Sequence, residues 1–337
     1  MRKLLQPAVI IPAIFGVSVF AALIAVSNVK KVLAVMSGFP HLFLLYFLLL
    51  TAAYEVVRCV QWHNLLTALG LHVAPRTQVF SFAAGEVSKN MPLGNFFQNY
   101  LLQRATGTDF GLSSSATLLI VLIQVAVALA GLVILGIGPW DWLRPLIVGG
   151  LAAFLLAVWA VRALHRSPHM PAWMTAHAWL RYALAEYRQF RHGADVLLHP
   201  RVLASASLLG AVYTLIAGAS FYLITRGLGL DAISFGEALA VSLFSLAVGL
   251  IVPIPVDIGT LEVSGVAALI ALGVGPSDAV AAVIINRVLS IGASSALALL
   301  SIVVMPGELR LVIRGRPPVA PLSPARTEWS GSGDCPI

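Results

Sequence analysis

Apolar segments long enough to cross a lipid bilayer recur along this chain, and they restrict its fold more than any other feature. A transmembrane helix needs about 20 apolar residues to cross a hydrocarbon layer of ~30 Å. Hydrophobic residues make up 59% of the 337 residues and charged residues only 10%, whereas soluble domains carry about 25% charged residues. The sequence therefore predicts an all-α, polytopic membrane helix bundle with no soluble catalytic domain attached.

Hydropathy and segment length predict about six full spans. They lie at roughly 8–28, 40–60, 113–137, 145–163, 202–225 and 277–305. The first follows a basic start, but no small-x-small cleavage site ends its apolar core, so we expect a retained span and not a secretion signal. Two further apolar segments, 78–106 and 236–274, are too interrupted by polar residues, glycine and proline to be ordinary spans.

Arginines indicate how the spans are oriented. The loop at 162–201 contains Arg162, Arg166, Arg181, Arg188, Arg191 and Arg201. Short loops rich in Lys and Arg face the cytoplasm, so we expect this loop and both termini to be cytoplasmic and the protein to lie in the cell (inner) membrane. The membrane domain is predicted to comprise residues 1–305. Residues 306–337 are rich in Pro, Ser and Gly, which predicts a disordered cytoplasmic tail.

The basic loop also mixes Trp, Leu and Tyr with Arg and His at helical spacing, in the stretch WMTAHAWLRYALAEYRQFRHGADVLL. This pattern is typical of an interfacial amphipathic helix that binds anionic lipid headgroups. An ordinary connecting helix with a solvated basic face would produce the same pattern. The sequence leaves both interpretations open.

Two passages of the chain, at about 40–137 and 202–305, repeat one pattern. Each passes from a span through Leu-Gly-Leu to a short apolar segment, a proline break, a second short segment and another full span. The sequence separation from Pro92 to Gln124 equals that from Pro255 to Arg287. Because the interrupted segments follow spans that leave opposite faces of the membrane, we expect two re-entrant helical hairpins in an inverted repeat. Many secondary transporters form their substrate site in this way.

Polar residues gather at both proline breaks, although they are costly to bury in a membrane. The candidate substrate-binding residues of the first hairpin and the span after it are Glu86, Lys89, Asn90, Asn99 and Gln124. Those of the second hairpin and its following span are Asp257, Glu262, Asn286 and Arg287. An antiparallel return after the second break can bring Arg287 back to the depth of Glu262, so we expect these two residues to face one cavity.

Sequence spacing predicts two further charged pairs. Glu86 and Lys89 lie three residues apart, so on a helix they face the same side. Glu55 and Arg58, near the end of the second predicted span, are interpreted as a helix-end pair, because an arginine there can extend to the interface. Each charged group either belongs to a substrate or ion pathway or only fixes the register of the helices.

The second break resembles a known family. It reads PIPVDIGTLE and ends at Glu262, with LGV and then Arg287 further along the chain. This is similar to the pattern P-x-P-G-G-x-G-x-x-E, a G-V turn and an arginine in the flippase-like family, which comprises the transmembrane region of lysylphosphatidylglycerol synthases and related membrane proteins. NMP and LLQRATG in the first half resemble that family's other motifs. The similarity spans roughly 40–305, and Val256 and Asp257 replace the family's paired glycines.

The resemblance implies a lipid transporter that moves a lipid with a polar headgroup between leaflets. Aminoacyl-phospholipids, glycolipids, polyprenyl-linked sugars and hopanoid-type lipids are all possible substrates. The alternatives are a membrane-embedded lipid-modifying enzyme and an accessory subunit that works with lipid-biosynthetic enzymes. The sequence has no GxxxxGK[ST], HExxH, GxSxG or paired DxD motif, so we expect no enzymatic activity, no cofactor, no metal and no nucleic-acid partner.

Overall fold

All secondary-structure elements that the computed structural model describes are helices, which confirms the all-α class. The described residues are 37–86, 88, 94–136, 145, 148–149, 152, 178–251 and 259–315. Four helices in this part are long and apolar enough to span a membrane. They are α3 (His41–Ala68), α6 (Phe110–Leu135), α10 (Pro200–Gly227) and α13 (Pro276–Val304). The predicted span at 8–28 and most of that at 145–163 lie outside the described residues.

Helix α3 is longer than the predicted span at 40–60, and this changes where its charges lie. It continues to Ala68 and ends in a turn at Gly70, whose φ is 73°. The prediction that Glu55 and Arg58 form a pair at a helix end is therefore wrong, because both residues lie in the middle of α3. Their polarity lowers the local hydropathy, so the span predicted from hydropathy ends near them.

Both interrupted segments, predicted at 78–106 and 236–274, fold as pairs of short helices. The pairs are α4 (Pro75–Glu86) with α5 (Phe97–Thr106), separated by the 3-10 turn η3 (Gly94–Phe96), and α11 (Phe235–Ile251) with α12 (Thr260–Ala271). The helices of each pair pack against each other. Even the longest, α11, extends only about 26 Å, less than the ~30 Å of a bilayer core. Each pair is a helical hairpin with the polar break at its tip, and its re-entry into a membrane stays a prediction.

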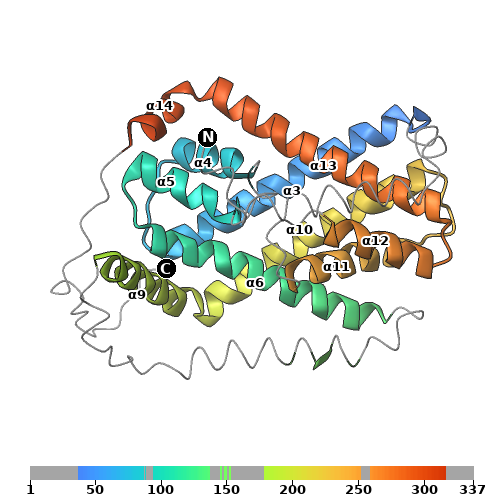
Figure 1. Ribbon diagram of the computed structural model, residues 1–337, viewed down its shortest axis with the longest axis horizontal. Helices are drawn as coiled ribbons and strands as arrows, with labels where there is room; N and C mark the ends of the chain where they lie inside the picture. The colour runs from blue at the N-terminus through green and yellow to red at the C-terminus, as the bar shows by residue number, and fades with distance from the viewer. Residues whose placement is uncertain are drawn as a thin grey trace.

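The two halves of the bundle run in opposite directions (Figure 1). Helices α3 and α10, each the first long helix of its half, pack against each other, and in this view α3 runs from right to left while α10 runs from left to right. Helices α6 and α13 are likewise opposed. The α4–α5 hairpin lies at the left end of the bundle and the α11–α12 hairpin at the right end. This arrangement supports the inverted repeat predicted for about 40–137 and 202–305.

Two helices flank the repeats. Helix α9 (Ala178–Leu197) lies within the basic loop at 162–201 and packs against α6, so the predicted helix is present. Helix α14 (Pro306–Arg314) follows α13 and packs on α4, α5 and α13. The prediction of a disordered tail is wrong for this segment, where apolar and charged residues alternate at helical spacing. Residues 316–337 lie outside the described part.

The apolar core of the described residues forms two clusters, and each contains residues of both halves. One includes Trp62 and Leu102 with Ala206 of α10, and the other includes Ile224 and Leu269 with Leu129 of α6. Many large apolar side chains point outward, as expected where lipid tails are the solvent. Examples are Leu45, Leu49, Ile134, Leu299 and Val303.

Candidate functional site

Two adjoining cavities lie where the two halves of the bundle meet. The first has a volume of about 150 Å³ and the second about 220 Å³. Both are lined by Tyr54, Ala217, Ser242, Asn286 and Arg287. Because these residues come from α3, α10, α11 and α13, neither half could form the cavities alone.

The predicted site residues fall into three groups. Those that line the cavities are Glu86, Gln124, Glu262, Asn286 and Arg287. Those outside the described residues are Lys89, Asn90 and Asp257. The remaining one, Asn99, lines neither cavity: it is fully buried, and its amide donates a hydrogen bond of 2.8 Å to Thr117 Oγ1. Asn99 therefore braces α5 against α6.

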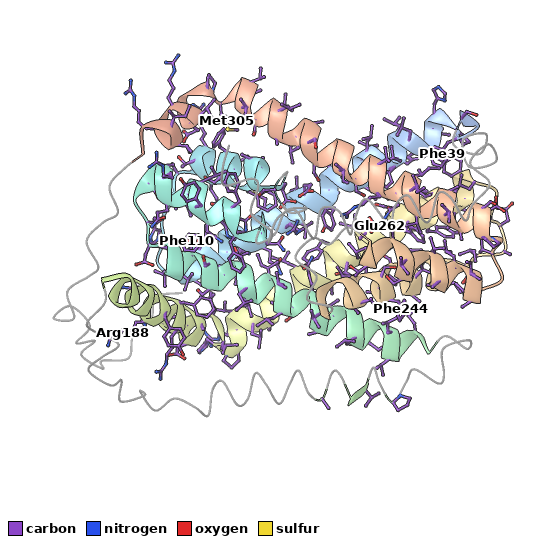
Figure 2. All side chains as sticks on the ribbon, viewed as in Figure 1. Phe39, Phe110, Arg188, Phe244, Glu262 and Met305 are labelled. Carbon is purple, nitrogen blue, oxygen red and sulfur yellow. The ribbon has the colours of Figure 1, made fainter. Side chains whose placement is uncertain are left out.

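Glu262 and Arg287 form an ion pair on the wall of the first cavity. Arg287 Nε lies 3.0 Å from Glu262 Oε1, which agrees with the expectation that the two residues face one cavity. The Glu262 side chain is 1% exposed and that of Arg287 17%; Figure 2 shows Glu262 in the interior of the bundle. Arg287 also lines the second cavity, so this ion pair lies where the two cavities adjoin.

The start of α12 holds the Glu262 carboxylate. The backbone N–H of Gly259 donates a hydrogen bond of 2.6 Å to Glu262 Oε2, and Glu262 lies in the first turn of α12, where the positive end of the helix dipole stabilises an anion. Gly259 has a φ of 106°, a conformation open to glycine and strained for other residues. The glycine of the break thus positions the N–H that binds the carboxylate.

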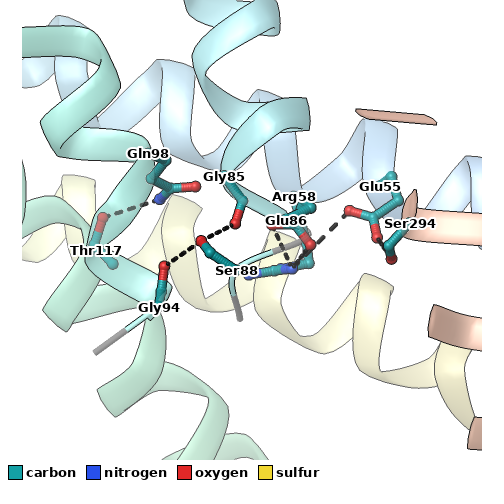
Figure 3. A network of polar contacts seen from close by, with 9 residues as sticks. All are labelled: Glu55, Arg58, Gly85, Glu86, Ser88, Gly94, Gln98, Thr117 and Ser294. Atoms are coloured by element: carbon teal, nitrogen blue, oxygen red, sulfur yellow. Dashed lines mark hydrogen bonds and ion pairs between the residues drawn. The ribbon is translucent and has the colours of Figure 1, made fainter. Parts of the chain in front are cut away.

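Arg58 and Glu86 form a second ion pair, in the first half (Figure 3). Arg58 Nη1 donates to both carboxylate oxygens of Glu86, at 3.1 and 3.0 Å. Both side chains are buried, and the guanidinium lies 5.5–6.0 Å from the ring centroids of Tyr54, Phe82 and Tyr213. Burial among rings and a charge-assisted contact make this a strong, closed pair.

A third carboxylate, Glu55, joins the same network. Its Oε1 accepts a hydrogen bond of 3.1 Å from Ser294 Oγ, and its Oε2 lies 4.0 Å from Arg58 Nη1. Glu55 lines the second cavity together with Glu86. Among the described residues around the two cavities, three carboxylates lie near two guanidinium groups, so charges of both signs are present there.

Side-chain hydrogen bonds hold the break of the first hairpin (Figure 3). Ser88 Oγ donates toward the carbonyls of Gly85 and Gly94, at 2.6 and 3.0 Å. Gln98 Nε2 donates to Thr117 Oγ1 at 3.0 Å. In lipid, backbone groups freed by a break need such partners.

The sequence interpretation missed several groups of this site. Arg58 was assigned to a helix end, and its contact with Glu86 was not predicted. The predicted pairing of Glu86 with Lys89 stays a prediction, because Lys89 lies outside the described residues. Serines that line the second cavity were not singled out; they are Ser220, Ser242, Ser290, Ser294 and Ser295. One sequence signal indicated a partner for Arg58. Arg58 lies within a continuous helical pattern, and a charge at mid-span is expensive unless it has a partner.

One family model matches the chain. It is described as the lysylphosphatidylglycerol synthase TM region, and the match covers residues 13–298. No curated protein matches the chain. The matched region includes both hairpins, both ion pairs and both cavities.

Proposed function

This chain belongs to the family of the lysylphosphatidylglycerol synthase TM region, a multi-pass membrane family tied to lipid handling, and we propose a function on that basis. The protein moves a lipid with a polar headgroup between the two leaflets of the cell (inner) membrane. The headgroup is of the aminoacyl-, glyco-, polyprenyl- or hopanoid-type. The two cavities are the proposed headgroup site.

One observation carries this proposal: cavities with charged and polar side chains in their walls lie between the halves of a bundle whose long helices are otherwise apolar. The main barrier to moving a lipid across a bilayer is the transfer of its polar headgroup through hydrocarbon. Asn286, Gln124 and the serines of the walls can replace the water around a headgroup, while the tails stay in lipid. Arg287 and the three carboxylates offer partners to headgroup charges of either sign.

The opposed halves suit a site that opens alternately to the two sides. We propose that the α4–α5 and α11–α12 hairpins enter the membrane from opposite faces and meet at the cavities, with both termini in the cytoplasm. Inverted repeats with broken helices support alternating access in secondary transporters. If one half rocked against the other, the side of the membrane from which a lipid can reach Arg287 would change.

Helix α9 offers a second contact with lipid in this proposal. Arg188 is exposed on it and lies at the periphery of the bundle (Figure 2). Basic side chains on a helix at the membrane surface attract anionic headgroups by about 1 kcal/mol each. We therefore assign α9 to the cytoplasmic surface of the membrane.

Reconstitution of the purified chain in liposomes tests the proposal. Phosphatidylglycerol with a fluorescent headgroup becomes accessible to a quencher outside the vesicle only when it reaches the outer leaflet. We expect the chain to accelerate this access, Arg287→Gln to abolish the acceleration, and Arg310→Gln, an exposed control on α14, to retain it.

Other outcomes would identify the alternatives. A change in the mass of the lipid would indicate a lipid-modifying enzyme. Movement only after addition of lipid-biosynthetic enzymes would indicate an accessory subunit. Absence of movement for fluorescent phosphatidylglycerol and for the lipids that co-purify with the chain would reject transport.

A further inference from the structure

An apolar groove lies beside the second cavity, between the first hairpin and the C-terminal helices. Its volume is about 440 Å³. It is lined by Phe80, Ala84, Phe97, Leu101, Ser295, Ala298, Leu299, Ile302, Leu309 and Val312. Ser295 is the one polar residue in this lining, so the groove offers almost nothing to a charged or strongly polar ligand.

The groove and the second cavity meet at Ser295, which lines both. On α13 the residues that line the second cavity are Asn286, Arg287, Ser290, Ile291, Ser294 and Ser295, and those that line the groove are Ser295, Ala298, Leu299 and Ile302. This spacing of three and four residues keeps all of them on one helix face. Along about 22 Å of that face, the side chains change from a charged arginine and serine hydroxyls to apolar groups.

We propose that the groove binds one hydrocarbon chain of the lipid whose headgroup occupies the second cavity. This inference rests on the proposed function and adds to it a site for the tail. A lipid whose headgroup lies at Arg287 and whose hydrocarbon chain lies beyond Ser295 matches the polar and the apolar parts of this α13 face. Burial of each methylene in the groove favours binding, because apolar contacts replace looser contacts in the bilayer.

Helix α14 closes the groove and is fixed in place. Leu309 and Val312 of α14 form part of the lining. Arg104 on α5 donates from Nε to the carbonyl of Val312 at 3.3 Å and from Nη2 to that of Ile313 at 3.1 Å. These bonds tie the C-terminal end of α14 to the first hairpin, so the groove has walls on several helices and is not merely a furrow on one of them.

Photo-crosslinking with phosphatidylglycerol that carries a diazirine in its acyl chain tests the proposal. The full chain is placed in nanodiscs with this lipid and illuminated, and the modified residues are mapped by mass spectrometry. We expect adducts on groove residues of α4, α5, α13 and α14. Ala84→Phe fills the groove and should reduce those adducts about tenfold, because the ring occupies the space of the acyl chain.

The matched variants are Ser295→Phe and Ala296→Phe. Ser295 lies at the junction, whereas Ala296 is exposed and lines neither the groove nor the two cavities. We expect Ser295→Phe to reduce lipid movement in liposomes and Ala296→Phe to leave both readouts unchanged. Ser295→Phe also serves as the test variant if Ala84→Phe does not fold.

Two outcomes overturn the tail site. One is a set of adducts confined to residues that do not line the groove, or equal in Ala84→Phe and Ala296→Phe. The other is a groove protected from the probe, which would mean that a protein segment occupies it. Adducts in the groove without lipid movement would instead reject the proposed transport and leave the tail site supported. The two proposals can therefore fail separately.

Discussion

The two buried ion pairs differ in what surrounds each carboxylate. In the first half, Glu86 is the last residue of α4, where the negative end of the helix dipole opposes an anion, and Arg58 contacts both of its oxygens. In the second half, Glu262 lies at the start of α12, where the dipole favours it, and the Gly259 N–H binds one oxygen. Glu86 therefore depends on its arginine more than Glu262 does.

The arginines of the two pairs also differ in how exposed they are. Arg58 is enclosed by aromatic rings, whereas Arg287 lines both cavities and is partly exposed. Arg287 is paired with Glu262 but also borders both cavities. We therefore propose that the first pair braces the bundle and that the second belongs to the headgroup site.

The largest expected effect follows from breaking the first pair. We expect Arg58→Met to lower the free energy of unfolding in detergent by about 3–5 kcal/mol, because it leaves the Glu86 carboxylate buried without its partner. The measurement is thermal or denaturant unfolding of the purified variant. The double variant Arg58→Met with Glu86→Met should recover most of the loss. A double variant as unstable as the single one would mean that the bracing role is wrong.

Gly259→Ala probes the backbone that holds Glu262. A φ of 106° is strained for alanine, so we expect a loss of about 1–3 kcal/mol in the free energy of unfolding. Gly292→Ala on α13 is the control, because a Cβ there meets no atom within 4 Å and alanine favours a helix. Equal stabilities of the two variants would argue against a required glycine at the break.

Arg287→Gln tests the second pair. We expect the free energy of unfolding to fall by only about 1 kcal/mol, because the start of α12 still stabilises Glu262. Lipid movement in liposomes should fall at least about tenfold.

The charge-swapped variant, with Glu262→Arg and Arg287→Glu, separates the two roles of this pair. If the pair only braces the fold, the swap should restore both stability and lipid movement. If Arg287 binds the headgroup, the swap should leave lipid movement low.

Gln124→Leu should have the smallest effect. Gln124 lines the first cavity opposite the charged residues of the second half, and its neutral amide contributes one hydrogen bond to a headgroup. We expect lipid movement to fall about fivefold, equivalent to ~1 kcal/mol, with stability unchanged. A loss as large as that of Arg287→Gln would show that the two halves contribute equally to the site.

Local sequence features were sufficient to predict the helical hairpins and to place Glu262 and Arg287 at one cavity. Proline, glycine and short apolar segments mark a broken helix without reference to the rest of the fold. Glu262 and Arg287 are separated by one short helix and part of a span, so the geometry of a single antiparallel return was enough to bring them together.

The first ion pair could not be predicted in this way. Arg58 and Glu86 lie 28 residues apart, and their contact depends on how α4 packs against α3 beyond the turn at Gly70. Asn99 shows the same limit, since its sequence setting resembles that of a site residue but its partner is Thr117 on α6. Interhelical packing decides which of several polar groups face a cavity and which face each other.

The sequence by itself determined that the chain is a helical membrane protein of this family, with two broken segments in repeated halves. The reason is that the bilayer imposes length and polarity on each segment separately. Only the tertiary structure decided that α3 and α13 share two cavities, that Arg58 neutralises Glu86, and that an apolar groove continues from Ser295. These features exist between helices, and in lipid the contacts between helices depend on shape and on a few polar pairs that hydropathy does not record.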